Sequence, residues 1–311
     1  MSASLERLVV DCIERETSLR YLLYPLSLCF RLGVYLKNYV YDKGWIRSKK
    51  VQGQVISIGN LVAGGTGKTP FLMLLLERIQ KGTVLTRGYR TADEPRMIVR
   101  RFPKIAVHIG KNRVNAALRS KGPMFLDDGM QYRALHRDLE IVILNSRDLF
   151  GRGYFLPRGF LRDFPSRLKC ADYIVLNHCQ EEAQFHEQVA MIRQYSEAPV
   201  IGVRFKLRDS YNGQKVGLFC GIGNPRLFIE AVEQSGGEVV ETMLLPDHVA
   251  PEREALESFR LLCKEKGVEK LLCTEKDWVK LEDPTGIECA YGEMEVLYGK
   301  QNFEELIRKI E

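Results

Sequence analysis

Short apolar runs rich in β-branched residues alternate with amphipathic stretches between residues 51 and 205. The runs have the length and composition of buried strands, and the stretches between them repeat their apolar positions with a helical period. We therefore predict an α/β fold with a doubly wound, mostly parallel sheet. Its expected strands are Val55–Ile58, Thr83–Thr86, Ile105–Ile109, Met124–Asp127, Glu140–Leu144, Tyr173–Leu176 and Val200–Phe205, and its expected helices include Phe71–Ile79, Val114–Ser120 and Glu182–Tyr195.

A polar, turn-prone segment, "RDSYNGQK" (208–215), interrupts this alternation. A shorter α/β pattern follows, with expected strands Val216–Cys220, Glu238–Thr242 and Lys270–Thr274, and the tail adds one further strand and a closing helix. We predict four parts: an N-terminal helical segment (1–50), a first α/β domain (51–207), a smaller α/β domain (208–285), and a linker strand with the closing helix (286–311).

Residues 19–41 form the most apolar stretch of the chain. Its longest charge-free run, Tyr21 to Phe30, is too short to span a bilayer, which needs roughly 20 apolar residues. One interpretation is a core helix kinked at Pro25. The other is a helix lying in a membrane interface, with its three basic residues among the lipid headgroups.

Charge and cysteine usage narrow the class of protein. The net charge of +6 is concentrated, because residues 1–50 and 147–169 each carry a surplus of four Lys and Arg over Asp and Glu. Such an uneven distribution indicates an anionic partner that meets these two stretches. The eight cysteines form no C-x-x-C pair, which argues against a zinc ribbon or a disulfide scaffold and favours buried thiols.

The stretch "GNLVAGGTGKTP" (59–70) follows an expected strand and precedes an expected helix. It matches the phosphate-binding template G-x-x-x-x-G-K-[ST] except at its first position, which is Val62. Later glycines still leave the backbone free to turn its N–H groups toward phosphate oxygens. Lys68 can reach the β- and γ-phosphates, and the Thr69 hydroxyl can bind Mg²⁺. We predict an ATP cradle made by Ala63, Gly64, Gly65, Thr66, Gly67, Lys68 and Thr69.

A pair of carboxylates, Asp127 and Asp128, ends the expected strand in "PMFLDDGMQ" (123–131). Adjacent carboxylates at the end of a strand repel each other unless a cation lies between them. In a nucleotide-binding protein Mg²⁺ fits that position. We predict that Asp127, Asp128 and Thr69 bind the metal.

Three further segments carry polar side chains suited to phosphoryl transfer. Asp93 follows a strand in "LTRGYRTADEP", where a carboxylate can accept a proton, and His248 in "LPDHVAP" can complete a base. Residues 147–169 interleave aromatic and basic side chains with glycine and proline. Such a composition can stack on bases, lie against lipid phosphates, or form an arginine-bearing lid over the nucleotide.

Taken in order, these motifs resemble the tetraacyldisaccharide 4'-kinases of lipid A biosynthesis in Gram-negative bacteria. The matching stretches are "GNLVAGGTGKTP", "LTRGYR", "DEP", "GKNRV", "DDGMQYRALHRDLEIV", "FLPRGFLRDFPSRL", "GIGNPRLF", "LPDH" and "TEKDWVKL", between about residues 19 and 281. The family's phosphate loop also lacks the first glycine of the template.

The resemblance implies ATP- and Mg²⁺-dependent phosphorylation of the 4'-hydroxyl of a tetraacyldisaccharide 1-phosphate, which gives lipid IVA. It also implies two α/β domains joined by a two-stranded linker, and work at the cytoplasmic face of the inner membrane with residues 1–50 at the membrane surface. By position, Asp93 and His248 are a base dyad, while Arg162 and Asp163 occupy the lid's Arg-Glu positions.

Two other classes of function remain alternatives. One is another P-loop small-molecule kinase or nucleotide-dependent ATPase, which turns over without an amphiphile. The other is a nucleic-acid binder, which binds oligonucleotides with a strong salt dependence. We expect the lipid kinase, with a lipid A precursor and the membrane surface as partners, no nucleic acid, and no obligate protein partner.

Overall fold

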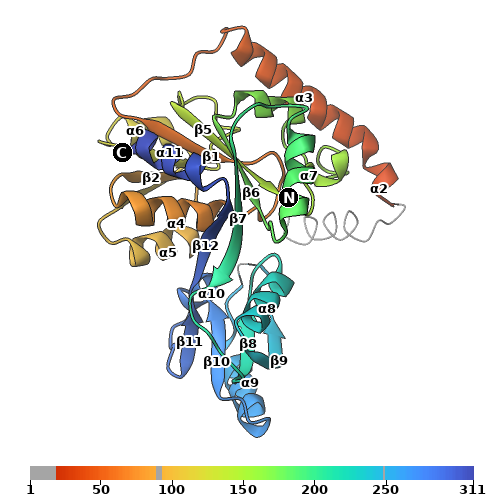
Figure 1. The fold of residues 1–311 in the computed structure, drawn as a ribbon, viewed down its shortest axis with the longest axis vertical. Coiled ribbons are helices and arrows are strands. Elements are labelled where there is room, and N and C mark those ends of the chain that lie inside the picture. The colour runs from red at the N-terminus through yellow and green to blue at the C-terminus, as the bar shows by residue number, and fades with distance from the viewer. Residues whose placement is uncertain (1–18, 89–92, 248) are drawn as a thin grey trace.

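The structure is a computed structural model that describes residues 19–88, 93–247 and 249–311. In this part of the chain the strands form one eight-stranded sheet and one four-stranded sheet (Figure 1). The α/β fold class is confirmed. The ten strands expected in the two α/β patterns all appear, each within two residues of its predicted ends.

The eight-stranded sheet has the order β12-β7-β6-β5-β1-β4-β2-β3 and is parallel except where β12 pairs with β7. Central β1 lies between β4 and β5, so the strand order reverses direction there, which is where α/β sheets place their ligands. The strands are β1 Val55–Gly59, β2 Thr83–Thr86, β3 Ala106–Ile109, β4 Met124–Asp127, β5 Leu139–Asn145, β6 Tyr173–Asn177, β7 Val200–Leu207 and β12 Gly292–Tyr298.

Helices cover both faces of this sheet, as its buried apolar strands require. One face packs with α4 and α11 around Phe71 and Phe303, and the other packs with α7 and the 147–169 loop around Phe185 and Phe155. The elements are α4 Lys68–Ile79, α5 Asp93–Arg101, α6 Arg113–Ala117, α7 Glu182–Ile192 and α11 Lys300–Ile310, with 3₁₀ turns η1 Gly151–Gly153 and η2 Pro165–Cys170 in the loop.

The smaller sheet is parallel and has the order β11-β10-β8-β9. It is covered by α8 on one side and α9 on the other, around Phe228 and Phe259. Its elements are β8 Lys215–Cys220, α8 Pro225–Gln234, β9 Glu238–Leu244, α9 Arg253–Glu265, β10 Lys270–Thr274, α10 Glu275–Trp278 and β11 Ile287–Ala290.

The tail differs from the single strand that its sequence predicts. It forms two strands that separate at Tyr291: β11 extends the smaller sheet, and β12 returns to pair antiparallel with β7 in the larger one. In Figure 1, β7 and β12 run side by side between the two sheets.

The apolar N-terminal stretch forms two helices, α2 Leu19–Leu22 and α3 Tyr24–Asp42. Pro25 lies in the first turn of α3, where its missing N–H costs no helical hydrogen bond. The helix is therefore interrupted before Pro25 and is not kinked at it. Ser27, Val34 and Asn38 are the residues of α3 that are buried, and most of its apolar side chains are exposed. The core-helix interpretation is therefore wrong.

Among the helices of the described residues, none has the length and apolar character needed to cross a membrane. The expectation of buried thiols holds only in part. Cys179, Cys220, Cys263 and Cys273 are buried, whereas Cys29 and Cys170 are exposed.

Candidate active site

The phosphate loop connects β1 to α4 at the centre of the larger sheet. Gly64 and Gly67 have φ values of 107° and 91°, in the left-handed region that glycine adopts without a steric penalty. At Gly67 a Cβ would also lie 2.3 Å from Nδ2 of Asn177. The glycines at these two positions are thus required by the backbone and, at Gly67, also by close packing.

Val62 stands where the template has its first glycine, and the structure gives the reason. Its side chain is only 6% exposed, and its backbone forms an antiparallel bridge with Leu161 of the 147–169 loop. The N–H of Ala63 donates to the carbonyl of Phe160 over 2.7 Å, and the N–H of Arg162 donates to the carbonyl of Leu61 over 2.8 Å. The 147–169 loop is therefore held directly on the first half of the phosphate loop.

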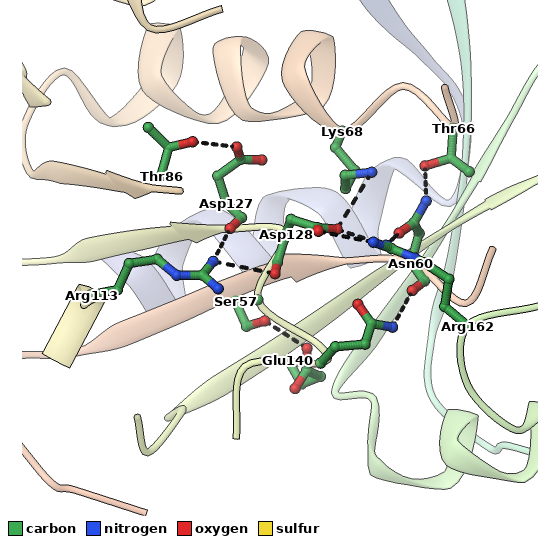
Figure 2. A network of polar contacts seen from close by, with 12 residues as sticks. Ser57, Asn60, Thr66, Lys68, Thr86, Arg113, Asp127, Asp128, Glu140 and Arg162 are labelled. Carbon is green, nitrogen blue, oxygen red and sulfur yellow. Dashed lines mark hydrogen bonds and ion pairs between the residues drawn. The ribbon is translucent and has the colours of Figure 1, made fainter. Parts of the chain in front are cut away.

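Amide side chains fix the second half of the loop. Asn60 Nδ2 donates to Thr66 Oγ1 over 2.9 Å (Figure 2). Asn177 Nδ2 donates to the Thr66 carbonyl over 3.0 Å. Gln131 Nε2 donates to the Asn60 carbonyl over 2.9 Å. Sequence reasoning missed these residues, although Asn60 directly follows β1 and Asn177 ends β6, and both strands are buried.

Lys68 and Thr69 are the first two residues of α4, and Pro70 follows in its first turn. The start of a helix presents free N–H groups and the positive end of the dipole, both of which favour a phosphate. Lys68 Nζ lies 3.6 Å from Oδ1 of Asp128. The predicted phosphate-binding lysine and one predicted metal ligand are thus side by side.

Asp127 ends β4, next to β1, and Asp128 follows it, but their environments differ. Asp128 accepts two hydrogen bonds from the Arg162 guanidinium, of 2.9 and 2.7 Å. Burial acts to raise the pKa of Asp128, but Arg162, Lys68 and Arg113 together outweigh it and hold that pKa well below the ordinary range. Asp128 is therefore ionised at neutral pH.

Asp127 accepts a hydrogen bond of 2.9 Å from Thr86 Oγ1. Burial and the nearby carboxylate of Glu94 raise the pKa of Asp127 to about 6, although Lys68 acts to lower it. A cation bound here would favour its ionised form. The turn itself is fixed by Arg113, whose Nη1 donates to the carbonyls of Asp127 and Asp128 over 2.7 and 3.3 Å (Figure 2).

Arg162 and Asp163 are adjacent in sequence but lie in different surroundings. Arg162 donates to Asp128 and also to Oδ1 of Asn60, so it joins the 147–169 loop to both the metal site and the phosphate loop. Asp163 is buried against α3, where it accepts hydrogen bonds from Asn38 Nδ2 over 2.8 Å and from the N–H of Phe164 over 2.9 Å. The structure thus brings Arg162, but not Asp163, to the carboxylate pair.

The structure describes one of the two predicted base residues. Asp93 begins α5 and is 2% exposed, and its neighbour Glu94 is close enough to Asp127 to raise the pKa of that residue. His248 lies outside the described residues. Its neighbours Asp247 and Val249 belong to the loop that follows β9 in the smaller sheet.

The chemistry of the donor set fits Mg²⁺, because Thr69, Asp127 and Asp128 all offer oxygen atoms. Within residues 19–88, 93–247 and 249–311, no group of three or more His, Cys, Asp and Glu side chains is arranged to bind a metal. Mg²⁺ characteristically keeps several waters and takes one or two carboxylates together with substrate phosphates. This site therefore suits a metal that arrives with a nucleotide.

Comparisons with known proteins agree with this geometry. The family model described as tetraacyldisaccharide-1-P 4'-kinase matches residues 19–311. The tetraacyldisaccharide 4'-kinase of Chlamydia trachomatis is 38% identical, with 76% of each chain covered, and that of Syntrophus aciditrophicus is 33% identical, with 84% of each covered. A crystal structure of LpxK from Aquifex aeolicus in complex with ATP superposes with a TM-score of 0.74 at 26% identity, covering 94% of this chain and 99% of that one.

Proposed function

This chain belongs to the tetraacyldisaccharide-1-P 4'-kinase family, and we propose that it transfers the γ-phosphoryl group of ATP to the 4'-hydroxyl of tetraacyldisaccharide 1-phosphate. The product is lipid IVA, and the step belongs to lipid A biosynthesis. The chain is an ATP-dependent phosphotransferase. The observation that carries the proposal is the convergence of Lys68 and Arg162 on Asp128 beside the phosphate loop.

The large-sheet half of the site binds and orients the nucleotide. The backbone of residues 63–69 surrounds the phosphates, and Lys68 binds the β- and γ-phosphate oxygens. Thr69, Asp127 and Asp128 would hold Mg²⁺, which would neutralise negative charge on the nucleotide phosphates. Arg162 is bonded to Asp128, which holds its guanidinium beside the phosphate loop, where it stabilises charge on the transferring phosphoryl group.

Asp93 and His248 form the base. The sugar 4'-hydroxyl oxygen bonds to the γ-phosphorus as the bond between that phosphorus and the β–γ bridging oxygen breaks. The hydroxyl proton passes to the dyad, and ADP leaves with the bridging oxygen. Asp163 contributes by fixing the 147–169 loop on α3 through Asn38.

The acylated substrate reaches this site from a membrane to which the protein binds. The observation that supports it is the apolar ridge, which we define as the exposed large apolar residues of α2, α3 and the turn after them: Tyr21, Leu22, Tyr24, Leu26, Leu28, Phe30, Leu32, Tyr35, Leu36, Tyr39, Trp45 and Ile46. The helices lie along the outside of the larger domain (Figure 1). Such a ridge suits peripheral binding in a lipid interface, here the cytoplasmic face of the inner membrane.

The test is an assay with tetraacyldisaccharide 1-phosphate, labelled ATP and Mg²⁺ in detergent micelles. Wild type forms the 4'-phosphorylated product, and Lys68→Ala loses it. Lys81→Ala, which changes an exposed lysine just beyond the other end of α4, is the matched control and retains activity. Absence of product from wild type, or full activity of Lys68→Ala, would refute the proposal, and ATP turnover that needs no lipid would indicate another P-loop kinase or ATPase.

A further inference from the structure

Helix α10 and the turn after it carry the residues Glu275 to Lys280, whose role the phosphoryl-transfer site leaves open. The side chains point in two directions with helical spacing. Glu275 and Trp278 contact α5, whereas Lys276 and Lys280 contact the loop that contains residues 246–249. This short segment therefore contacts both elements that carry the proposed base.

The contacts with α5 are made by its last two residues. The Arg100 guanidinium lies over the Trp278 ring, with its carbon 3.5 Å from the ring centroid. Arg101 Nη1 lies 3.5 Å from Glu275 Oε2 and donates to the Gly292 carbonyl over 3.1 Å. Glu275 is buried, and burial raises its pKa although the two arginines act to lower it. A buried carboxylate of this kind makes the partner arginine costly to remove.

The contacts with the 246–249 loop hold both neighbours of residue 248. Lys276 Nζ lies 2.9 Å from Oδ1 of Asp247, and Lys280 Nζ donates to the carbonyl of Val249 over 3.3 Å. Lys280 is fixed in turn by fully buried Asp277, 2.6 Å away. The loop is also packed closely on Gly221, where a Cβ would lie 2.6 Å from the Val249 carbonyl oxygen.

We propose that residues 275–280 are a positioning clamp that sets the loop of His248 relative to the helix that begins at Asp93. The clamp rests on the proposed function, in which these two residues are the base. Helix α5 joins Asp93 at its first residue to Arg100 and Arg101 at its last, so a rigid helix links the clamp to one member of the dyad. Lys276 and Lys280 link it to the other.

The test is a double-mutant cycle between Lys276→Met and His248→Ala in the full-length protein, measured as lipid phosphorylation in micelles. A positioning residue acts through the residue that it positions. We expect Lys276→Met to lower kcat about tenfold in the wild-type background, because small misplacements of catalytic groups are costly, and to leave the KM for ATP within about twofold. In the His248→Ala background it causes no further loss.

Two sets of variants control for folding and for charge. Lys270→Met removes a similar ion pair, of 2.9 Å to Glu288, elsewhere on the smaller sheet and leaves kcat unchanged. Asp247→Asn, which removes the charge of the other partner, reproduces the Lys276→Met loss. The exchange Lys276→Asp with Asp247→Lys restores most of the activity if the ion pair itself is what matters.

Equal losses from Lys276→Met in both backgrounds would show a purely structural role and overturn the clamp. Activity of Lys276→Met and Asp247→Asn at the wild-type level, with His248→Ala impaired, would overturn the clamp alone. If His248→Ala itself kept wild-type activity, the proposed base would fail, and the clamp would fail with it.

Discussion

The two halves of the active site are assembled in different ways. In the larger domain, Lys68 and Arg162 both pair with Asp128 just after β4, beside β1, and all three side chains are partly buried. In the smaller sheet, the loop next to His248 is held by ion pairs such as Lys276–Asp247, whose aspartate is 44% exposed. The comparison indicates a nucleotide site preassembled in the larger domain, and a proposed base whose second member lies in a loop held by more exposed contacts.

The largest loss of activity is expected for a change at Asp128, which both Lys68 and Arg162 contact in the preassembled half. Asp128→Asn removes the charge that Arg162 and Lys68 share and one predicted metal ligand, so we expect kcat to fall on the order of 10²–10³-fold. Steady-state phosphorylation of the lipid at saturating ATP and Mg²⁺ measures it. Asp283→Asn, an exposed aspartate of the smaller domain, is the control, and a loss under tenfold for Asp128→Asn would mean that Asp128 is not central to the site.

Changes in the proposed base, Asp93 and His248, are expected to give the next largest loss of activity. Asp93→Ala and His248→Ala should each lower kcat/KM at least tenfold, roughly 1.4 kcal/mol of transition-state stabilisation. Because a coupled pair fails when either member is lost, the double variant should be about as slow as the singles. Multiplied losses in the double variant would show that the two residues act independently.

A variant of the apolar ridge tests which surface of the protein binds the membrane. Leu32→Asp places a charge on an exposed ridge position, and we expect about fivefold weaker binding to vesicles that contain anionic lipids. Leu261→Asp changes a leucine of similar exposure on α9, and this variant should bind vesicles like wild type. Co-sedimentation measures both, and equal binding by all three proteins would remove the ridge from the membrane surface.

The last effect concerns stability rather than activity or binding, at the edge of the preassembled half. Burial, together with Arg147, lowers the pKa of His178 to about 4. An unfolded histidine binds its proton below about pH 6.5, so between pH 6.5 and 4 the unfolded state takes up protons that the folded state does not, and the free energy of unfolding falls as pH falls. His178→Asn introduces a residue that tolerates the φ of 63° found here. It removes the contribution of His178 to the fall in the free energy of unfolding, which we expect to be on the order of 1–2 kcal/mol.

Urea unfolding at several pH values between 4 and 7 measures this contribution. His186→Asn changes an exposed histidine on α7 and should leave the pH dependence as it is in wild type. If His178→Asn lost stability with acid as steeply as wild type, proton uptake by His178 would not be the cause.

Local sequence was sufficient for the strands and for the phosphate loop. Buried strands such as Met124–Asp127 are short apolar runs, which can be recognised in the sequence without knowing which elements pack on them. The tail was misjudged because Ile287–Ala290 and Gly292–Tyr298 are continuous in sequence, and only pairing with different sheets separates them. The N-terminal stretch was compatible with a core helix or an interfacial helix, because apolar composition alone does not show whether other elements of the protein cover its side chains.

The sequence by itself determined the chemistry of this site: glycines where the backbone must turn, a lysine and a threonine at a helix start, and two carboxylates after a strand. These features depend on neighbours within a few residues. Only the tertiary structure decided that Val62 pairs with Leu161, that Arg162 bonds Asp128, and that Asp163 turns away to Asn38. Such contacts join residues that are 34 to 125 positions apart, and the order of strands in the sheet, rather than any local pattern, brings them together.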